Sequence, residues 1–217
     1  MKKNAIILAA GEGNRMKSSI PKQFLLINKK PILIHVLEKF TDFDKVIIAV
    51  NKKQIKYWKD ICKKYNVKCP HLISNGGKTR FHSVKNALDK VDDHAIIAIH
   101  DAARPIVSKQ LIKTLTSSVS EGIGAVPMIQ INDSIRKMNG DNTIAVNREN
   151  MLMVQTPQCF IAKDIKKSYK VKYSKRFTDD ASVFEANGGT IKQIEGEISN
   201  IKITNKQDLK IINAIIN

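Results

Sequence analysis

The stretch Ala5-Ile6-Ile7-Leu8-Ala9-Ala10-Gly11-Glu12-Gly13-Asn14-Arg15-Met16 decides the fold, because it places a glycine-rich turn directly after a short apolar strand. Glycine and small neighbours let the backbone come close to a ligand and direct N–H donors toward it. Arg15 in this turn and Lys22 shortly after it can neutralise phosphate charge. The pattern is neither a P-loop nor the G-x-G-x-x-G dinucleotide motif, since Met16 occupies the position of the third glycine. It predicts a different nucleotide-binding loop, with an ordinary glycine turn as the alternative.

The length and composition of the chain indicate one domain spanning residues 1–217. With 217 residues, 42% of them hydrophobic, the chain can bury a sizeable core. Its longest apolar runs, Ala5–Ala10 and Ala95–Ile99, have the length of strands and fall far short of the ~20 residues that cross a bilayer. The first run is also too short for a secretory signal, so we expect a cytoplasmic protein without a membrane span. The three cysteines form no C-x-x-C pair, and neither a disulfide nor a zinc site is expected.

The net charge of +17 raises the question of nucleic-acid binding. The lysines, however, come singly or in pairs such as Lys52-Lys53 along the whole chain. A nucleic-acid reader would concentrate its basic groups on one element and interleave aromatic residues. We therefore interpret the charge as a solvated lysine-rich surface that attracts small anionic substrates and binds no nucleic acid. A basic nucleic-acid-binding protein remains the non-enzyme alternative.

Apolar strand-like segments alternate with amphipathic helical segments over the first 130 residues, which is a βαβ rhythm. The segments rich in Ile and Val are apolar on both faces, as in a buried parallel sheet. The predicted fold class is α/β, with a mainly parallel twisted sheet, helices on both faces, and a ligand crevice beyond the carboxyl ends of the strands. The expected strands are Ala5–Leu8, Lys45–Val50, His71–Ser74, Ala95–His100 and Gly124–Ile129, and the expected helices are Pro31–Phe40, Gln54–Tyr65, Ser83–Leu88 and Lys109–Val119.

After Ile131 the rhythm breaks at a predicted β-hairpin arm that covers residues 132–150. Ser134–Met138 and Thr143–Asn147 flank a turn at Asn139-Gly140-Asp141-Asn142. Two short strands are not stable alone in water, so the arm needs a partner surface on its own domain or on another subunit. The remaining expected elements are a return through Met151–Phe160, a helix near Asp164–Tyr173, strands near Thr190–Ile194 and Ile201–Thr204, and a last helix over Gln207–Ile216.

Two further motifs place polar groups where expected strands end. Gly76-Gly77-Lys78-Thr79-Arg80 leads into a helix through Ser83, and this motif can bind a base or ribose or merely cap the helix through Thr79. His100-Asp101-Ala102-Ala103-Arg104 offers the Asp101 carboxylate to the crevice, where it suits magnesium or a ribose. His100 is more often a satisfied core histidine than a ligand. Arg104 can equally be the structural partner of an acidic group.

Three later segments gather hydroxyl, amide, carboxylate and lysine groups, and each is weak evidence alone. They are Gln155-Thr156-Pro157-Gln158, Thr178-Asp179-Asp180-Ala181-Ser182 and Asn200-Ile201-Lys202-Ile203-Thr204. Thr178-Asp179 is also a good helix-capping sequence, and a lysine on the polar face of a strand is ordinarily solvated.

In this order the motifs resemble one family. They are L-A-A-G-x-G-x-R-M, P-K-Q-F, G-G-x-x-R-x-x-S-V, H-D-A-A-R-P, Q-T-P-Q-x-F, T-D-D-A-S and N-I-K-I-T. From Ile6 to Leu209 the chain is similar to the 2-C-methyl-D-erythritol 4-phosphate cytidylyltransferases of the non-mevalonate isoprenoid pathway. The resemblance implies transfer of CMP from CTP to 2-C-methyl-D-erythritol 4-phosphate (hereafter methylerythritol phosphate), with release of pyrophosphate. It also implies a Rossmann-like nucleotidyltransferase fold, a Mg²⁺ cofactor, and a homodimer joined through the arm.

The resemblance further implies roles for individual residues. Arg15 and Lys22 match catalytic positions that stabilise the triphosphate and the transition state. The nucleotide-binding positions are Ala9, Ala10, Gly11, Gly13, Gly77, Ser83, Asp101 and Ala102, and Asp101 is also the candidate metal ligand. The substrate-binding positions are Ser134, Arg148, Thr156, Thr178 and Lys202, of which Arg148 comes from the neighbouring subunit in such enzymes.

The chain departs from the commonest family pattern at a few positions. Lys78 stands where an acidic residue often follows the double glycine, Ser134 where threonine is usual, and Asn86-Ala87 where glycine is common. None of these changes removes a charged catalytic group. The enzyme alternative is a ribitol-5-phosphate cytidylyltransferase, which Ala9-Ala10-Gly11 and Ala102-Ala103 disfavour. A non-catalytic nucleotide sensor is disfavoured because both catalytic cations are present.

Overall fold

The computed structural model of this chain describes residues 1–11 and 20–216. Its strands are β1 (Lys2–Ala9), β2 (Leu26–Ile27), β3 (Lys30–Pro31), β4 (Lys45–Val50), β5 (Leu72–Asn75), β6 (Ala95–Asp101), β7 (Ile123–Gln130), β8 (Ile135–Asn139), β9 (Asn142–Val146), β10 (Leu152–Val154), β11 (Gln158–Ile161) and β12 (Thr190–Glu195). Its α-helices are α1 (Ile32–Leu37), α2 (Ile55–Lys64), α3 (Arg80–Leu88), α4 (Lys109–Ser117), α5 (Ala162–Ser168), α6 (Asp180–Glu185) and α7 (Lys206–Ile216). Short 3₁₀ turns cover Lys22–Phe24, Glu38–Phe40 and Lys52–Gln54.

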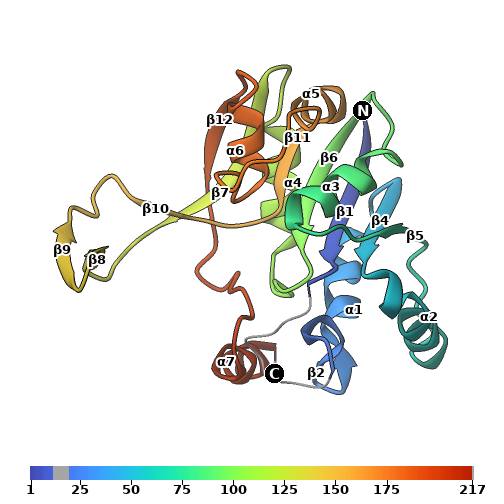
Figure 1. The fold of residues 1–217 in the computed structure, drawn as a ribbon. Coiled ribbons are helices and arrows are strands. Elements are labelled where there is room, and N and C mark those ends of the chain that lie inside the picture. The colour runs from blue at the N-terminus through green and yellow to red at the C-terminus, as the bar shows by residue number, and fades with distance from the viewer. Residues whose placement is uncertain (12–19, 217) are drawn as a thin grey trace.

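A mainly parallel sheet forms the centre of the molecule (Figure 1). Within the described ranges it has eight strands in the order β10-β7-β11-β6-β1-β4-β5, with β12 paired to β7. β5, β4, β1 and β6 run parallel, whereas β11 and β10 pair antiparallel with their neighbours. The chain passes from β1 to β4 on one side and later returns to β6 on the other. This change of direction is a topological switch point at the carboxyl end of β1, where open α/β sheets bind their ligands.

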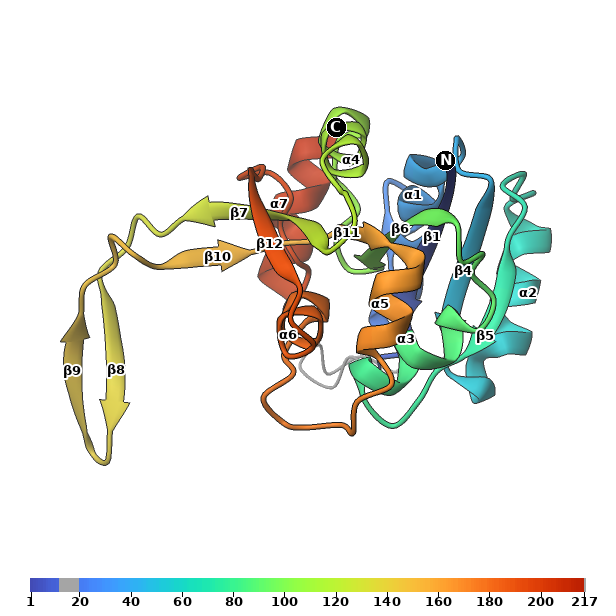
Figure 2. The same ribbon diagram turned by 90° about the horizontal axis from the view of Figure 1, so that it is seen from above.

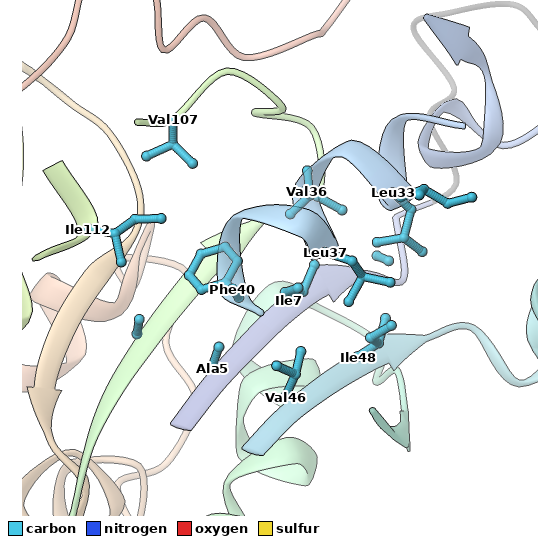
Figure 3. Packing of buried hydrophobic residues seen from close by; sticks show 14 of the residues in the cluster. Ala5, Ile7, Leu33, Val36, Leu37, Phe40, Val46, Ile48, Val107 and Ile112 are labelled. Carbon is cyan, nitrogen blue, oxygen red and sulfur yellow. The ribbon is translucent and has the colours of Figure 1, made fainter. Parts of the chain in front are cut away.

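Helices cover both faces of the sheet because its central strands are apolar on both faces. Ala5 and Ile7 of β1 belong to an apolar cluster with residues of α1, α2 and α4. Ile6, which points the opposite way, belongs to a second cluster with residues of α3, α5 and α6. Figure 3 shows the first cluster, in which Ile7 lies with Leu37 and Phe40. The alternation follows the two-residue period of a strand and confirms the predicted α/β class.

A third, smaller cluster anchors the C-terminal helix beside the sheet. Ile212 of α7 packs with Ile27 of β2, Ala103 after β6, and Ile203, all of them buried. The cluster thereby holds the segment before α7 next to the loop that follows β6.

The β-hairpin forms as predicted. β8 and β9 pair from Ile135↔Val146 to Asn139↔Asn142, and Gly140 in the two-residue turn has a φ of +61°. The hairpin projects from the end of the ribbon made by β7 and β10 and lies away from the sheet (Figure 2). Met138 is 74% exposed and Ile144 54% exposed, so this single chain leaves apolar side chains of the arm in water.

Several elements differ from the sequence expectation: β2 and β3 were not expected, and the helix expected over Pro31–Phe40 is α1 followed by a 3₁₀ turn. Ile201–Thr204 is not a strand, because the Ile203 N–H donates to the Ala103 carbonyl (2.8 Å) and the Thr204 N–H donates to the Asp208 carboxylate (2.7 Å). Its alternating pattern reflects one buried residue, Ile203, in an extended loop. The expected helix near Asp164–Tyr173 is also displaced, since α5 covers Ala162–Ser168.

Among the described residues, we find no helix with the length and apolar character needed to cross a membrane.

Candidate active site

A cavity of about 620 Å³ lies at the carboxyl ends of the central parallel strands. The end of β1 contributes Ala9, and the end of β6 contributes Asp101. The structure brings together nine of the residues predicted for the site, namely Ala9, Ala10, Gly11, Lys22, Gly77, Ser83, Asp101, Ala102 and Lys202. Predicted residues Gly13 and Arg15 lie outside the described residues. A cavity therefore lies where the crevice was predicted, beyond the strand ends, and the binding roles of the residues that line it stay predictions.

One wall of the cavity is formed by two loops in close contact. A Cβ on Gly76 would lie 2.3 Å from the Ala10 Cβ, and a Cβ on Gly77 would lie 2.4 Å from the His82 Cβ. Glycine is therefore required at both positions for this approach. The Gly77 N–H donates to the Ser83 hydroxyl (3.0 Å), which itself donates to the Thr79 carbonyl (3.0 Å).

Thr79 caps the helix that follows this wall. Its side chain accepts a hydrogen bond from the His82 N–H at the start of α3, as expected from the sequence. The cap and the glycine loop are compatible, because the cap fixes the helix start while the loop remains on the cavity surface.

Cationic side chains dominate the charge of the cavity lining. Lys22, Lys78, Arg80 and Lys202 line it, and Asp101 is the one acidic residue among the lining residues that the structure describes. A cavity with this excess of positive charge suits a polyanionic ligand.

Asp101 lies between two of these cations. Its Oδ2 is 2.7 Å from Lys202 Nζ, and its Oδ1 is 3.5 Å from Arg80 Nε. Although burial opposes ionisation, Arg80 and Lys202 hold the pKa of Asp101 well below its usual value. The carboxylate is therefore ionised and ordered at the cavity wall.

Lys22 reaches the cavity from the 3₁₀ turn Lys22–Phe24. Its Nζ donates to the Ile203 carbonyl at 3.1 Å, directly beside Lys202 in sequence. The adjacent Gln23 is buried and donates to the Ala9 carbonyl (2.7 Å), which ties this turn to the end of β1. Two lysines separated by 180 residues thus lie in one cavity lining.

Thr156 was predicted to bind substrate, but it lies behind the cavity wall. It is buried, and its hydroxyl accepts from the Asp101 N–H (3.1 Å) and lies 3.0 Å from His100 Nδ1. His100 Nε2 lies 2.9 Å from the Arg104 carbonyl, so the consistent assignment protonates Nε2 and lets Thr156 donate to Nδ1. These contacts support Asp101 from behind, and a direct contact between Thr156 and substrate stays a prediction.

His100 is the satisfied core histidine that the sequence favoured. It is fully buried, and burial lowers its pKa to about 4. Arg104, considered as a partner for an acidic group, instead donates to the main-chain carbonyls of Asn200 (2.6 Å) and Val154 (3.4 Å). Both residues hold the loop after β6 in place.

Besides Thr156, three predicted substrate residues do not line the cavity of this chain. Ser134 and Arg148 belong to the exposed arm, where Arg148 donates to the Asn132 carbonyl. Thr178 is exposed just before α6. Their roles therefore stay predictions, and those of Ser134 and Arg148 require a second subunit.

Several lining residues were not predicted as site residues. Asn51 directly follows β4, so its place at a strand end was a usable signal. Gln23 lay within the P-K-Q-F motif without a role of its own. Arg80 was noted at a helix start, but its ion pairs join residues far apart in sequence, and no local pattern reveals them.

The donor atoms of the described lining residues include a single carboxylate, that of Asp101. Among the described residues there is no group of three or more His, Cys, Asp or Glu side chains placed to hold a metal. Both oxygens of Asp101 already face cations. Magnesium commonly binds through one or two carboxylates together with substrate phosphates, so this lining suits a Mg²⁺ ion that arrives on the nucleotide.

Known proteins similar to this chain share its full length and its fold. A protein from Azobacteroides pseudotrichonymphae named 2-C-methyl-D-erythritol 4-phosphate cytidylyltransferase is 42% identical, over 99% of this chain and 98% of that protein. A protein of the same name from Clostridium botulinum is 40% identical, over 96% and 94% of the two chains. The solved structure of the Francisella tularensis 2-C-methyl-D-erythritol 4-phosphate cytidylyltransferase (IspD) has a TM-score of 0.81 and 34% identity, covering 99% of each chain.

The family model described as 2-C-methyl-D-erythritol 4-phosphate cytidylyltransferase matches residues 4–217. The chain belongs to the 2-C-methyl-D-erythritol 4-phosphate cytidylyltransferase family.

Proposed function

We propose that this chain transfers CMP from CTP to methylerythritol phosphate, giving 4-diphosphocytidyl-2-C-methyl-D-erythritol and pyrophosphate. The observation that carries the proposal is the cation-lined cavity at the strand ends of a chain that belongs to this family along nearly its whole length. The chain is thus a nucleotidyltransferase of isoprenoid biosynthesis. Neither the ribitol phosphate enzyme nor the nucleic-acid-binding protein is favoured by this membership.

The reaction needs charge neutralisation more than it needs a strong base. An oxygen of the methylerythritol phosphate attacks the α-phosphorus of CTP in line, and the bond to the β-phosphate oxygen breaks with its electrons passing to pyrophosphate. The attacking phosphate monoester is already largely a dianion near neutral pH, because its second pKa is about 6. The described lining accordingly offers lysines and an arginine rather than an activated serine or cysteine nucleophile.

Each cation has a distinct place in this scheme. Lys22, with Arg15 of the L-A-A-G-x-G-x-R-M motif, stabilises the triphosphate and the charge that accumulates in the transition state. Lys202, which lines the same cavity as Lys22, meets the incoming phosphate of methylerythritol phosphate. Ala9, Ala10, Gly77 and Ser83 bind the cytidine part at the glycine-loop wall. A Mg²⁺ ion that arrives with CTP supplies further neutralisation of the phosphate oxygens.

We further propose that the arm makes the chain a homodimer and completes each site. The exposed apolar side chains of β8 and β9 need a covering surface, which a second copy of the arm provides. Arg148 and Ser134 then reach the cavity of the neighbouring subunit and bind methylerythritol phosphate with Thr178. We propose that the protein acts in the cytoplasm, as expected from the sequence.

Pyrophosphate release tests the proposed function. The purified chain with CTP and Mg²⁺ is expected to release pyrophosphate rapidly with methylerythritol phosphate and much more slowly with ribitol 5-phosphate. Faster turnover of ribitol 5-phosphate than of methylerythritol phosphate would contradict the proposal and identify the chain as a ribitol-5-phosphate cytidylyltransferase. Salt-sensitive binding of DNA or RNA without any consumption of CTP would favour the non-enzyme alternative.

A further inference from the structure

Behind the cavity, a buried carboxylate holds the arginine that faces Asp101. Asp180 is the first residue of α6, and its side chain has no exposed area. It accepts a two-pronged hydrogen bond from Arg80, Nη1 to Oδ1 at 2.7 Å and Nη2 to Oδ2 at 2.6 Å. The Tyr169 hydroxyl donates to the same Oδ1 at 2.6 Å. Three short hydrogen bonds thus define the place of this carboxylate.

The sheet fixes Asp180 relative to Asp101. The N–H groups of Asp180 and Ala181 both donate to Gln158 Oε1, at 3.0 and 2.9 Å. Gln158 begins β11, which pairs with β6, the strand that ends at Asp101. The two carboxylates are therefore held by neighbouring strands on either side of Arg80.

This arrangement limits how Arg80 can meet Asp101. Both terminal nitrogens of the guanidinium face Asp180, and only Nε is directed at Asp101, at 3.5 Å. Asp101 Oδ2 is left to Lys202, at 2.7 Å. If the two terminal nitrogens of Arg80 (the fork of its guanidinium) were free, they could bind both oxygens of Asp101 through two parallel hydrogen bonds. Arg80 would then compete with Lys202 for Asp101 Oδ2.

The protonation states agree with these contacts. Although burial opposes the charge, Asp180 and Asp101 raise the pKa of Arg80 well above its usual value. Burial and the neighbouring Asp180 carboxylate raise the pKa of Tyr169, so the phenol remains a hydrogen-bond donor. Two anions and two cations thus alternate from Asp180 to Lys202.

We propose that Asp180 is a positioning residue for cytidylyl transfer: by holding the fork of Arg80, it reserves one oxygen of Asp101 for Lys202. Asp180 thereby determines the position of the Lys202 ammonium group, which binds the phosphate of methylerythritol phosphate. The inference rests on the proposed function, in which Lys202 binds methylerythritol phosphate. Without the Asp180 carboxylate, the fork turns toward Asp101 and Lys202 is displaced.

The test compares Asp180→Asn with Glu185→Gln by steady-state pyrophosphate release. Glu185 is the matched control, because it lies on the same helix and loses the same charge, but its side chain is exposed. In Asp180→Asn, kcat/KM for methylerythritol phosphate is expected to fall about 10- to 100-fold, chiefly through a higher KM. The KM for CTP should change by less than about threefold, and Glu185→Gln should stay within about twofold of the wild type in all constants.

A merely structural role has a different kinetic signature. Loss of folded molecules lowers the apparent kcat and leaves both KM values unchanged. That pattern in Asp180→Asn, or constants equal to those of the wild type, would overturn the positioning role.

A second variant covers the case in which Asp180→Asn does not fold. Arg80→Lys keeps a positive charge, but its ammonium lacks the two parallel hydrogen bonds that hold Arg80 on Asp180, so it can pair with Asp101 and compete with Lys202. The same rise in KM for methylerythritol phosphate is expected, and an unchanged KM overturns the inference. An inactive wild type would refute the proposed function itself, whereas an active wild type with unaffected variants refutes only the role of Asp180.

Discussion

At the scale of single residues, the site depends on buried side chains behind the cavity wall. Thr156 joins the Asp101 N–H to His100, and His100 in turn contacts the Arg104 carbonyl. All three side-chain contacts lie in the interior, where an unpaired polar group is costly. The carboxylate at the end of β6 therefore owes its position to a buried line of hydrogen bonds.

Replacing Thr156 by valine should remove the hydroxyl that joins the Asp101 N–H to His100. The Asp101 N–H and His100 Nδ1 both lose their partner, so we expect the free energy of unfolding to fall by about 2 kcal/mol. Urea unfolding of Thr156→Val and Thr156→Ser measures the difference. Serine keeps the hydroxyl and valine keeps the methyl group, so a loss of stability confined to Thr156→Ser would show that the methyl group, rather than the hydrogen bonds, matters.

The buried His100 should make stability depend on pH. Its pKa falls from 6.5 to about 4 in the folded state because of burial, so the unfolded chain binds more protons between these values. The contribution of neutral His100 to the free energy of unfolding is fully present above pH 6.5 and is lost as the pH falls toward 4. The loss amounts to about 3 kcal/mol.

Urea unfolding of wild type and His100→Gln at pH 7 and pH 4 isolates this effect. Glutamine does not titrate, so the stability difference between the two proteins should shrink by that amount at the lower pH. A difference that is constant with pH would contradict a neutral, buried His100.

At the scale of elements, α7 and the loop before it deliver Lys202 to the end of β6. Ile203 is buried in the cluster that contains Ile212 of α7, and its N–H donates to the Ala103 carbonyl. Asp208 of α7 accepts hydrogen bonds from the Thr204 N–H and hydroxyl, both at 2.7 Å. α7 thus fixes the loop that carries Lys202, although none of its residues is among those that line the cavity.

Two isoleucines on the same turn of α7 test this anchoring. Ile212 is buried and Ile211 is 45% exposed. Ile212→Ala should lower the free energy of unfolding by about 3 kcal/mol, and Ile211→Ala by less than about 1 kcal/mol. At a temperature where both variants are folded, only Ile212→Ala should raise the KM for methylerythritol phosphate. Equal effects of the two substitutions would argue against an anchoring role of α7.

The elements of the sheet were predictable because their signal is local. Ile6 and Ile7 point to opposite faces, and both faces are apolar, so the parallel sheet and its helix layers could be inferred. The last loop was misassigned as a strand because Ile203 alternates with Lys202, although its backbone donors go to Ala103 and Asp208. Which partner accepts a backbone hydrogen bond is a property of the folded chain and has no local pattern.

The same limit applies to the site. Residues at strand ends, such as Ala9 and Asp101, were predicted, since parallel strands end at one edge of the sheet. The pairing of Arg80 with Asp180 joins residues 100 positions apart, and the structure alone reveals it. The burial of Thr156 behind Asp101 was likewise not predictable, because a buried and an exposed hydroxyl look alike in sequence.

At the scale of the whole molecule, the cavity of a single chain is lined by only part of the predicted substrate residues. The arm projects from the body (Figure 2), and Arg148 is not among the residues that line the cavity. A homodimer that exchanges arms would bury the apolar side chains of the hairpin and complete both sites at once.

Mixing two inactive variants tests this exchange. In a dimer of Arg148→Ala and Lys202→Ala subunits, one of the two sites receives an intact body and an intact partner arm. Random reassociation should therefore restore about a quarter of the wild-type activity. If Arg148 acts within its own chain, every site keeps one lesion, and the mixture would remain as inactive as its components.

The central claim is that cations from distant parts of the chain allow two mutually repelling phosphates to react. The most direct measurement is the kcat of Lys22→Met in the pyrophosphate assay, beside Lys113→Met on the exposed surface of α4 as control. We expect Lys22→Met to fold normally and to lose about 100- to 1000-fold in kcat, while Lys113→Met keeps the wild-type rate. A kcat of Lys22→Met close to that of the wild type would contradict the claim.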